Sequence, residues 1–296
     1  MNDTFSTYHP LVNFLFYGFV LGISMFFMHP VLMGISALGA VLYVISLKGK
    51  KAVVVIFAMC LPVMLLSAII NPLFTHQGVT ILYYFKSGNP LTLESIVYGI
   101  AAGAMMAVVI LWFSSLNVVL TSDKFVYLFG KILPAISLLL SMVFRFTPRF
   151  YGQMGKVSAA QKGIGRDAAS GNVWQKLRQG TRILSIMVTW SLENSVETAA
   201  SMKSRGYGLR GRTNFHLYTF SGRDKIVLAV MLLTFLGILG GITGKQLSVL
   251  YYPIFRINGC TPYAVVTYVL YGIVCFLPVI LKTVEDIKWR CLKSKI

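Results

Sequence analysis

Acidic residues are scarce in this sequence. Its 296 residues include nine Asp and Glu against 27 Lys and Arg, and only 12% of the chain is charged. No apolar run carries Asp, Glu, Lys or Arg near its middle, whereas proton relays and ion pathways within membranes depend on such groups. The chain also lacks a DDxxD-like cluster that would hold a metal-bound pyrophosphate. These absences count against a self-contained ion pathway and against a metal-dependent pyrophosphate enzyme.

Cysteine and histidine are also few. The four cysteines form no CxxC pair, and the four histidines match neither HExxH nor another ligand spacing. We therefore predict no metal site, no disulfide and no cofactor. Residues 240–245, GGITGK, come closest to a phosphate-binding loop, but the glycine spacing is one residue short and Gln246 replaces the expected Ser or Thr. We do not predict nucleotide binding there.

Apolar residues, in contrast, make up 56% of the chain, and its mean hydropathy is +0.72. A bilayer core of about 30 Å takes roughly 20 helical residues to cross. Six runs approach this length: 11–28, 31–47, 52–70, 95–115, 226–243 and 262–281. The sequence therefore predicts an all-α polytopic membrane protein with five to six transmembrane helices. The number depends on the first two runs, which flank His29 and Pro30 and are short enough to form one broken or re-entrant segment. No Lys or Arg precedes the first run, so we do not expect a cleaved signal peptide.

The basic residues fall on alternate connections between these runs. Of the 27 Lys and Arg, all but Lys86, Lys245 and Arg256 lie within residues 48–51, 124–225 and 282–295. Because cytoplasmic loops of membrane proteins are rich in Lys and Arg, we expect these stretches and both termini to be cytoplasmic. The net charge of +18 is then explained by topology and by attraction to anionic lipid or an acidic partner, and not by nucleic acid.

We divide the chain into transmembrane helices at 1–121, a cytoplasmic domain at 122–224, and further transmembrane helices with a basic tail at 225–296. Within the central domain we expect helices at 134–146, 148–164 and 173–205, with a break at 165–171. Pro134 and Pro148 suit first turns, and Thr147 suits a cap. Asn172 and Gln175 have the spacing of a capping box, and Gly206 can end the last helix.

The end of that last helix, residues 197–208, reads ETAASMKSRGYG. Small residues at 199–201 allow another backbone to approach closely, and Arg205 lies on the last turn. One interpretation is a cation that complements the helix dipole, worth about 0.3–1 kcal/mol. The other is recognition, because the planar guanidinium of Arg205 can pair bidentately with a carboxylate in a groove on another protein.

This segment resembles a signature of the T component of energy-coupling factor (ECF) transporters, the EcfT/CbiQ-like family, in which a stretch similar to EAMxARGYG closes a coupling helix. Arg205 and Gly206 match it, and Ser204 replaces the alanine. The family's first signature, similar to AQxARG, follows an Arg-Phe-x-Pro element that matches residues 145–148. It corresponds here to Ala160, Gln161, Gly163 and Gly165, with no arginine at its usual place and Arg166 two positions later. The resemblance also includes NPLF at 71–74 and Leu133-Pro134.

The resemblance implies a non-catalytic subunit in the cell membrane. Its partners would be two ABC-type ATPases, which receive the ends of the coupling helices, and a small substrate-binding membrane protein, the S component. The ATPase contacts would fall on Ala160, Gln161, Gly163, Gly165, Arg166, Ser204, Arg205 and Gly206. In this family recognition belongs to another subunit, so the sequence does not name the substrate. The resemblance leaves open a vitamin, a vitamin precursor and a transition-metal ion.

Two alternatives stay open at this point. A membrane-embedded enzyme could use the central Arg and Lys residues to hold a lipid or isoprenoid phosphate, although we find no nucleophile with its base. A stand-alone secondary transporter lacks the expected intramembrane charges and an internal repeat. Three GxxxG pairs, at 18/22, 99/103 and 237/241, predict close helix packing or, alternatively, the lining of a substrate path.

Overall fold

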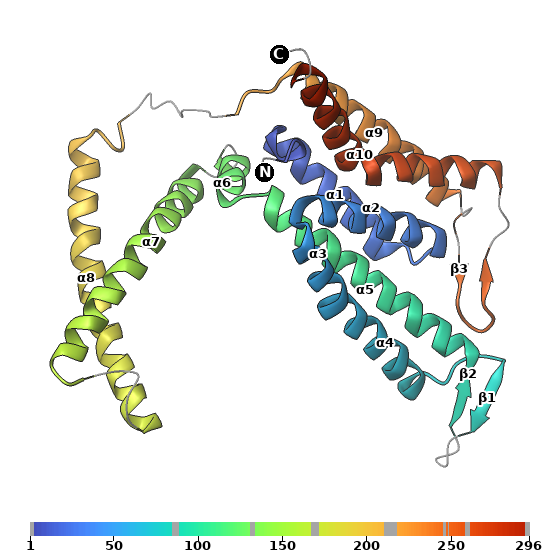
Figure 1. The fold of residues 1–296 in the computed structure, drawn as a ribbon, viewed down its shortest axis with the longest axis horizontal. Coiled ribbons are helices and arrows are strands. Elements are labelled where there is room, and N and C mark those ends of the chain that lie inside the picture. Colours follow the sequence, from blue (N-terminus) through green and yellow to red (C-terminus); the bar gives the residue numbers. More distant parts are fainter. Residues whose placement is uncertain are drawn as a thin grey trace. The chain divides into compact units, whose positions relative to one another are not determined.

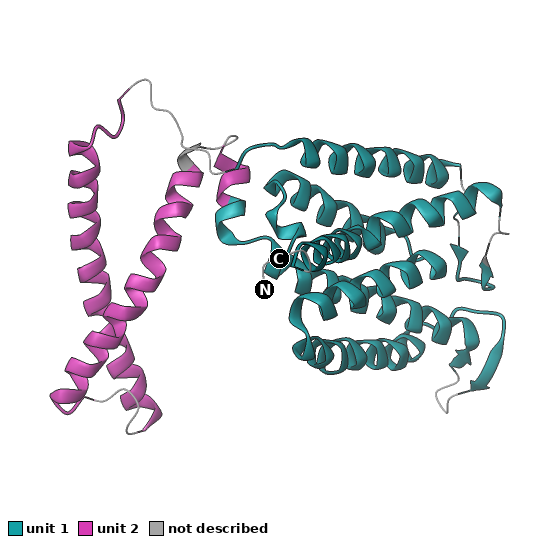
Figure 2. Cartoon of the chain, turned by 45° about the horizontal axis from the view of Figure 1, so that its top comes forward, with its two compact units in different colours: residues 1–125, 218–296 teal, residues 126–217 magenta. Residues whose placement is uncertain are grey.

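The computed structural model describes residues 3–84, 89–130, 134–166, 172–209, 218–244, 247, 249–257 and 261–293. The chain forms two compact units, which Figure 2 shows in different colours: unit 1 comprises residues 1–125 and 218–296, and unit 2 comprises residues 126–217. This division rests on packing and not on the side of the membrane, so the domain boundaries at 121/122 and 224/225 stay a prediction.

Unit 1 is a helical bundle with two short hairpins (Figure 1). Its helices are η1 (Phe5–Thr7), α1 (Pro10–Phe26), α2 (Pro30–Lys48), α3 (Lys50–Val55), η2 (Ile56–Cys60), α4 (Leu61–Phe74), α5 (Leu93–Val119), α9 (Gly222–Thr243) and α10 (Pro262–Lys293). Strands β1 (Ile81–Tyr84) and β2 (Pro90–Thr92) pair antiparallel, as do β3 (Val249–Leu250) and β4 (Arg256–Ile257). Helix α6 (Ser122–Gly130) begins in unit 1 and continues into unit 2.

The prediction of an all-α polytopic membrane protein is confirmed. Five helices of the described chain are long and apolar enough to cross a membrane: α2, the continuous helix Lys50–Phe74, α5, α9 and α10. The first predicted run forms a separate apolar helix, α1, of 17 residues. Pro30 is the first residue of α2, where its missing N–H costs no helical hydrogen bond. The chain around His29 therefore forms two separate helices, and the number of spans that they make stays a prediction.

The core of unit 1 is a polar and aromatic cluster between α1, α2, α5 and α10. Trp112 is fully buried, and its Nε1–H donates to Ser36 Oγ at 2.9 Å. Ser36 Oγ lies 3.0 Å from Ser24 Oγ, which lies 3.1 Å from the hydroxyl of Tyr271. These four side chains come from four different helices, so one chain of hydrogen bonds links the centre of the bundle.

Glycines explain the closest helix contact, between α4 and α5, which lie side by side in Figure 1. A Cβ added at Gly103 would lie 2.9 Å from the Cα of Met64, and one at Gly99 would lie 3.0 Å from the carbonyl oxygen of Ser67. Gly241 similarly faces Thr267 of α10, with 2.7 Å from an added Cβ to Thr267 Oγ1. A Cβ added at Gly18, by comparison, would have no atom within 4 Å beyond its chain neighbours and the backbone of its own helix. The packing interpretation is confirmed for two of the three GxxxG pairs.

An N-terminal segment, residues 3–9, packs into one end of unit 1. Phe5 is fully buried, and Asp3 Oδ2 accepts a hydrogen bond of 2.8 Å from the hydroxyl of Tyr43. Lys124, at the start of α6, is only 4% exposed. Its ammonium donates to the carbonyl oxygen of Ser6 at 2.5 Å, to Ser6 Oγ at 3.0 Å and to the carbonyl oxygen of Val119 at 2.8 Å. All three protons of this buried cation therefore have acceptors, and burial lowers its pKa to about 8.

Unit 2 contains the long helices α7 (Pro134–Gly163) and α8 (Val173–Ser204), which cross each other (Figure 2). Their contact includes Phe150 and Trp190, whose ring centroids lie 6.0 Å apart, and Arg149, whose guanidinium lies 5.8 Å from the centroid of the Trp190 ring. Among the described residues of the two helices, only Met187 and Asn194 are buried. Most of both helix surfaces is therefore exposed.

Helix α8 agrees with the prediction to within one residue, and the capping box of Asn172 and Gln175 is present. Residues 167–171 of the expected break lie outside the described residues. The predicted break before Pro148 is wrong, because α7 runs through this residue. The hydroxyl of Thr147 does not cap a new helix but donates to the carbonyl oxygen of Val143 at 2.8 Å. A single proline removes one hydrogen bond, and the turns on either side continue the helix.

Substituting Gly103 should show how much close packing, as opposed to helix propensity, contributes to the stability of unit 1. We expect Gly103→Ala to lower the free energy of unfolding by about 1–3 kcal/mol, because the added methyl group overlaps the backbone of α4. Gly18→Ala, also in a GxxxG pair but with open space around it, is the matched control and should not destabilise the protein. Thermal melting in detergent measures both. Equal effects of the two substitutions would contradict this account.

Lys124 should make the stability of unit 1 depend on pH. Its pKa is about 8 in the folded chain and 10.5 in its ordinary state, so above pH 8 the unfolded chain binds more protons and stability rises. Lys124→Met lacks this titration. From pH about 7.5 to about 9.5, we expect the melting temperature of the native chain to rise relative to that of Lys124→Met. Lys225→Met, which removes an exposed lysine, is the control, and a pH-independent difference for Lys124→Met would refute the assignment.

Candidate coupling surface

Helix α7 ends in a tight turn at Gly165. The residue has φ of 77°, in the left-handed region that favours glycine. The N–H of Gly165 donates to the carbonyl oxygen of Lys162 at 3.0 Å, and the N–H of Arg166 donates to that of Gln161 at 2.9 Å. These two bonds define a Schellman motif, which pairs carbonyl groups that the helix end leaves open.

Helix α8 ends in the same motif. Gly206 has φ of 80°, its N–H donates to the carbonyl oxygen of Lys203 at 3.1 Å, and the N–H of Tyr207 donates to that of Met202 at 3.0 Å. Arg205 is the residue immediately before the left-handed glycine. We call residues 160–166 the α7 tip and residues 201–207 the α8 tip.

The shared motif aligns the two tips residue by residue. Gly165 corresponds to Gly206, and position 164 therefore corresponds to position 205. Further equivalent pairs are Ala160 with Ser201, Gly163 with Ser204, and Arg166 with Tyr207. The equivalent of Arg205 is thus Ile164, a position that sequence analysis did not single out. Its only sequence signal is its place before the glycine, which becomes meaningful once Gly165 is known to carry the left-handed turn.

The structure places every predicted contact residue at one of these tips and near the surface. Gln161 and Gly206 are half-buried, and the others are exposed: Ala160, Gly163, Gly165, Arg166, Ser204 and Arg205. Ser204 Oγ donates to the carbonyl oxygen of Ser201 at 2.8 Å. Within the described part of the chain, the guanidinium groups of Arg166 and Arg205 have no hydrogen bond or ion pair. Both cations are therefore available to a partner.

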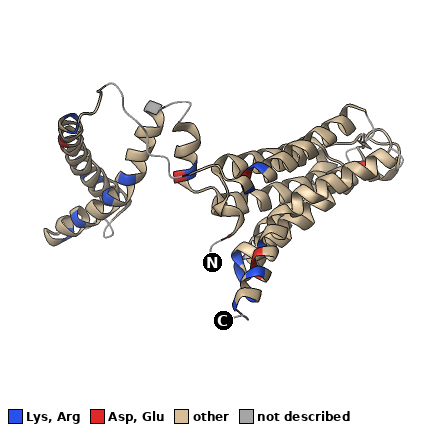
Figure 3. Cartoon of the chain, turned by 90° about the horizontal axis from the view of Figure 1, so that it is seen from above, with Lys and Arg blue, Asp and Glu red and all other residues tan. Residues whose placement is uncertain are grey.

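The two tips do not come together. Because α7 and α8 run in opposite directions where they cross, their C-terminal ends lie at opposite ends of the pair (Figure 2). At 1.5 Å per residue, a helix of 30 residues is about 45 Å long. Lys and Arg are spread along both helices, where the described acidic residues are Glu193 and Glu197 (Figure 3). The predicted contact residues thus lie at two separate places on a basic surface of unit 2.

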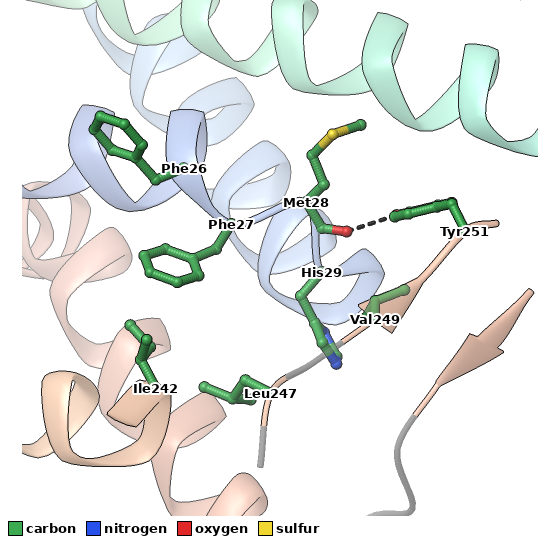
Figure 4. Close-up of a pocket in the computed structure, with 8 residues that line it drawn as sticks. All are labelled: Phe26, Phe27, Met28, His29, Ile242, Leu247, Val249 and Tyr251. Atoms are coloured by element: carbon green, nitrogen blue, oxygen red, sulfur yellow. Dashed lines mark hydrogen bonds between the residues drawn. The ribbon is translucent and has the colours of Figure 1, made fainter. Parts of the chain in front are cut away.

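Unit 1 also contains a cavity of about 410 Å³, lined by the end of α1 and residues 27–29 after it, the end of α9, β3 and residues next to β3 (Figure 4). Its lining is apolar apart from His29 and Tyr251, and the hydroxyl of Tyr251 donates to the carbonyl oxygen of Met28 at 2.5 Å. Nε2 of His29 lies 3.1 Å from the hydroxyl of Tyr268. No three His, Cys, Asp or Glu side chains of the described residues are placed to hold a metal. Lys245 of the GGITGK stretch and the following Gln246 lie outside those residues.

The family model and the named relatives that match this chain agree with each other. Residues 2–217 match the family model CbiQ, described as "Cobalt transport protein". Named relatives include the energy-coupling factor transporter transmembrane protein EcfT of Bacillus selenitireducens, 32% identical over 99 residues, which are 33% of this chain and 37% of the relative. EcfT 1 of Listeria monocytogenes is 32% identical over 104 residues, 35% of this chain and 39% of the relative. EcfT of Bacillus subtilis is 26% identical over 211 residues, 67% and 76% of the two chains. The first two matches thus span well under half of those relatives.

The two glycines of the α7 tip should respond in opposite ways to alanine. Gly165→Ala forces a Cβ into the left-handed region, which costs about 1–2 kcal/mol, although no atom lies within 4 Å of the added group. Gly163→Ala, inside the helix, should stabilise the last turn by up to about 1 kcal/mol. Hydrogen exchange of the peptide covering residues 160–166 should become faster in the first variant and slower in the second. The same response in both would contradict the Schellman assignment.

Proposed function

This chain belongs to the CbiQ cobalt transport protein family, and we propose that it is the transmembrane coupling subunit of an energy-coupling factor importer. In this role it carries no ATPase of its own. Two ABC-type ATPase subunits bind its tips, and a separate membrane protein, the S component, binds the substrate. The membrane helices of unit 1 and the named EcfT relatives support this assignment.

The observation that carries the proposal is Arg205 at the α8 tip. This arginine is exposed, follows the last turn of a 32-residue helix, and has no partner among the described residues. A guanidinium in that position can form two parallel hydrogen bonds with a carboxylate in a groove of an ATPase. Because such a pair fixes both distance and orientation, movement of the groove would move the helix end with it.

The separation of the tips supports two ATPase subunits. The ends of α7 and α8 lie at opposite ends of a crossing pair, so one groove cannot receive both (Figure 2). ATP binding brings the two ATPase subunits together, and the tips follow their grooves. The long helices then carry this movement towards the membrane.

The exposed faces of unit 2 support a further contact, with the S component. On α8, apolar side chains recur every four residues and form an exposed stripe, which consists of Leu184, Val188, Leu192 and Val196. An S component that rocks in the membrane would use such an apolar surface. Its cargo would be a vitamin, a vitamin precursor or a transition-metal ion. We place the protein in the cell membrane. The concentration of Lys and Arg in residues 124–225 supports a position of unit 2 and of both termini on the cytoplasmic side.

Arg205→Glu tests this function. We expect the tagged full chain to co-purify with ABC-type ATPases in detergent, and Arg205→Glu to lower their recovery about tenfold or more, because it places like charges together. The matched control is Arg178→Glu, which makes the same change at an exposed site near the start of α8. It should retain the ATPases. Both variants should fold normally, since neither side chain belongs to a core.

The readouts are the identity of the bound proteins by mass spectrometry and the ATPase activity of the eluate. Recovery of no ATPase with the native chain would refute the coupling role and would favour the membrane-embedded enzyme. Equal loss in Arg178→Glu and Arg205→Glu would show that net charge, and not the α8 tip, governs binding.

A further inference from the structure

The two tips share a backbone conformation but differ at the position before the left-handed glycine. The α8 tip has the cation Arg205 there, and the α7 tip has Ile164, an apolar side chain that is 61% exposed. Two other equivalent pairs also differ in character, Gln161 with Met202 and Arg166 with Tyr207, whereas Lys162 corresponds to Lys203 and Ala160 to Ser201. A large apolar side chain exposed at a helix end, in the place of a recognition residue, requires an account of its own.

We infer that the α7 tip docks by burying Ile164 in an apolar part of an ATPase groove, whereas the α8 tip docks through an ion pair of Arg205. This inference rests on the proposed function, because it describes how the two tips meet the ATPase subunits. It predicts that the groove for the α7 tip lacks the carboxylate that the other groove presents to Arg205.

Arg166 does not replace the missing arginine in this geometry. Its N–H makes the same hydrogen bond as that of Tyr207, so it stands at the position after the left-handed glycine. The chain has already turned away from the helix axis there, and Ile164 remains the residue that occupies the place of Arg205. A carboxylate in this place would lose water on docking and gain only an isoleucine as its neighbour, which is unfavourable. An apolar groove gains from the same contact.

The two modes of docking respond differently to salt. The attraction that brings the exposed Arg205 cation to a carboxylate of the groove is screened by salt, with a Debye length of about 10 Å at 0.1 M and about 3 Å at 1 M. Burial of an isoleucine is not weakened in this way, since it depends on removing apolar surface from water. The contact at the α8 tip should therefore weaken as the salt concentration rises, and the contact at the α7 tip should persist.

Equivalent positions of the tips provide a matched experiment. A photo-crosslinking amino acid is placed at Ala160 or at Ser201, which are both exposed and lie at the same place before each turn. The experiment uses membranes that contain the full chain, and it measures crosslinks to the ABC-type ATPase subunits that co-purify with it. Between about 0.1 M and about 1 M NaCl, we expect crosslinks from position 201 to fall roughly fivefold or more, and those from position 160 to change less than about twofold.

Substitutions then show which residue of the α7 tip makes the contact with the ATPase. Ile164→Asp should lower crosslinking from position 160 about tenfold, and Ile164→Arg should lower it as well, because neither charge has a partner in an apolar groove. Arg166→Ala should change it less than about twofold. The inference is overturned if Ile164→Arg strengthens the crosslink and makes it sensitive to salt, or if Arg166→Ala abolishes it.

The outcomes separate the inference from the function on which it rests. Absence of ATPase crosslinks from both positions in the native chain would refute the coupling role itself. Crosslinks from both positions with the same loss in high salt would leave the coupling role standing and refute the apolar docking of Ile164. Loss only at position 201, together with the effect of Ile164→Asp at position 160, would support it.

Discussion

Unit 1 depends on the chain of hydrogen bonds that joins Trp112, Ser36, Ser24 and Tyr271. In a bilayer no water is available to pair polar groups, so each of these side chains must find its partner within the protein. The four residues come from α5, α2, α1 and α10, and moving any one helix would break a bond of the chain. Gly39 of α2 allows the backbone near Cys275 to approach at the same level, with 3.1 Å from an added Cβ to its carbonyl oxygen. Polar pairing and close packing thus fix one arrangement of the bundle.

The same principle holds at the end of the bundle where α6 begins. A buried lysine is tolerated only when its charge and donors are satisfied, and Lys124 meets this condition through Ser6 and Val119. The N-terminal segment supplies two of the three acceptors, so it holds the start of α6 against the bundle. From this fixed start the chain continues into unit 2. The proposed coupling role would need such a point, because force on a loosely attached helix would be dissipated before it reached the membrane helices.

The sequence predicted the positions of the helices better than the contacts between them. The apolar run at 31–47 became α2 (Pro30–Lys48), because a long apolar segment in a bilayer has little choice but to be helical. Pro148 misled the prediction, since a proline is a local signal and the helix around it continues through its neighbours. Gly18 and Gly99 belong to identical GxxxG spacings, yet only Gly99 packs against another helix. Spacing identifies a smooth face but not whether a neighbour covers it. The register of the first signature was predicted from its resemblance to the family pattern, and the left-handed turn at Gly165 agrees with it. The equivalence of Ile164 with Arg205 became visible only once that turn was known.

Unit 2 is built on a different basis from unit 1. Since only Met187 and Asn194 are buried among the described residues of its long helices, α8 gains little from tertiary packing. Both of its ends are satisfied by local hydrogen bonds instead: the capping box at Asn172 pairs the first N–H groups, and the turn at Gly206 pairs the last carbonyl groups. A helix stabilised in this way can change its position without breaking a core, while the hydrogen bonds along it keep its length constant. In the proposed coupling role, the exposed faces of unit 2 would meet its partners, and the constant length of α8 would let this helix transmit movement as a rigid rod.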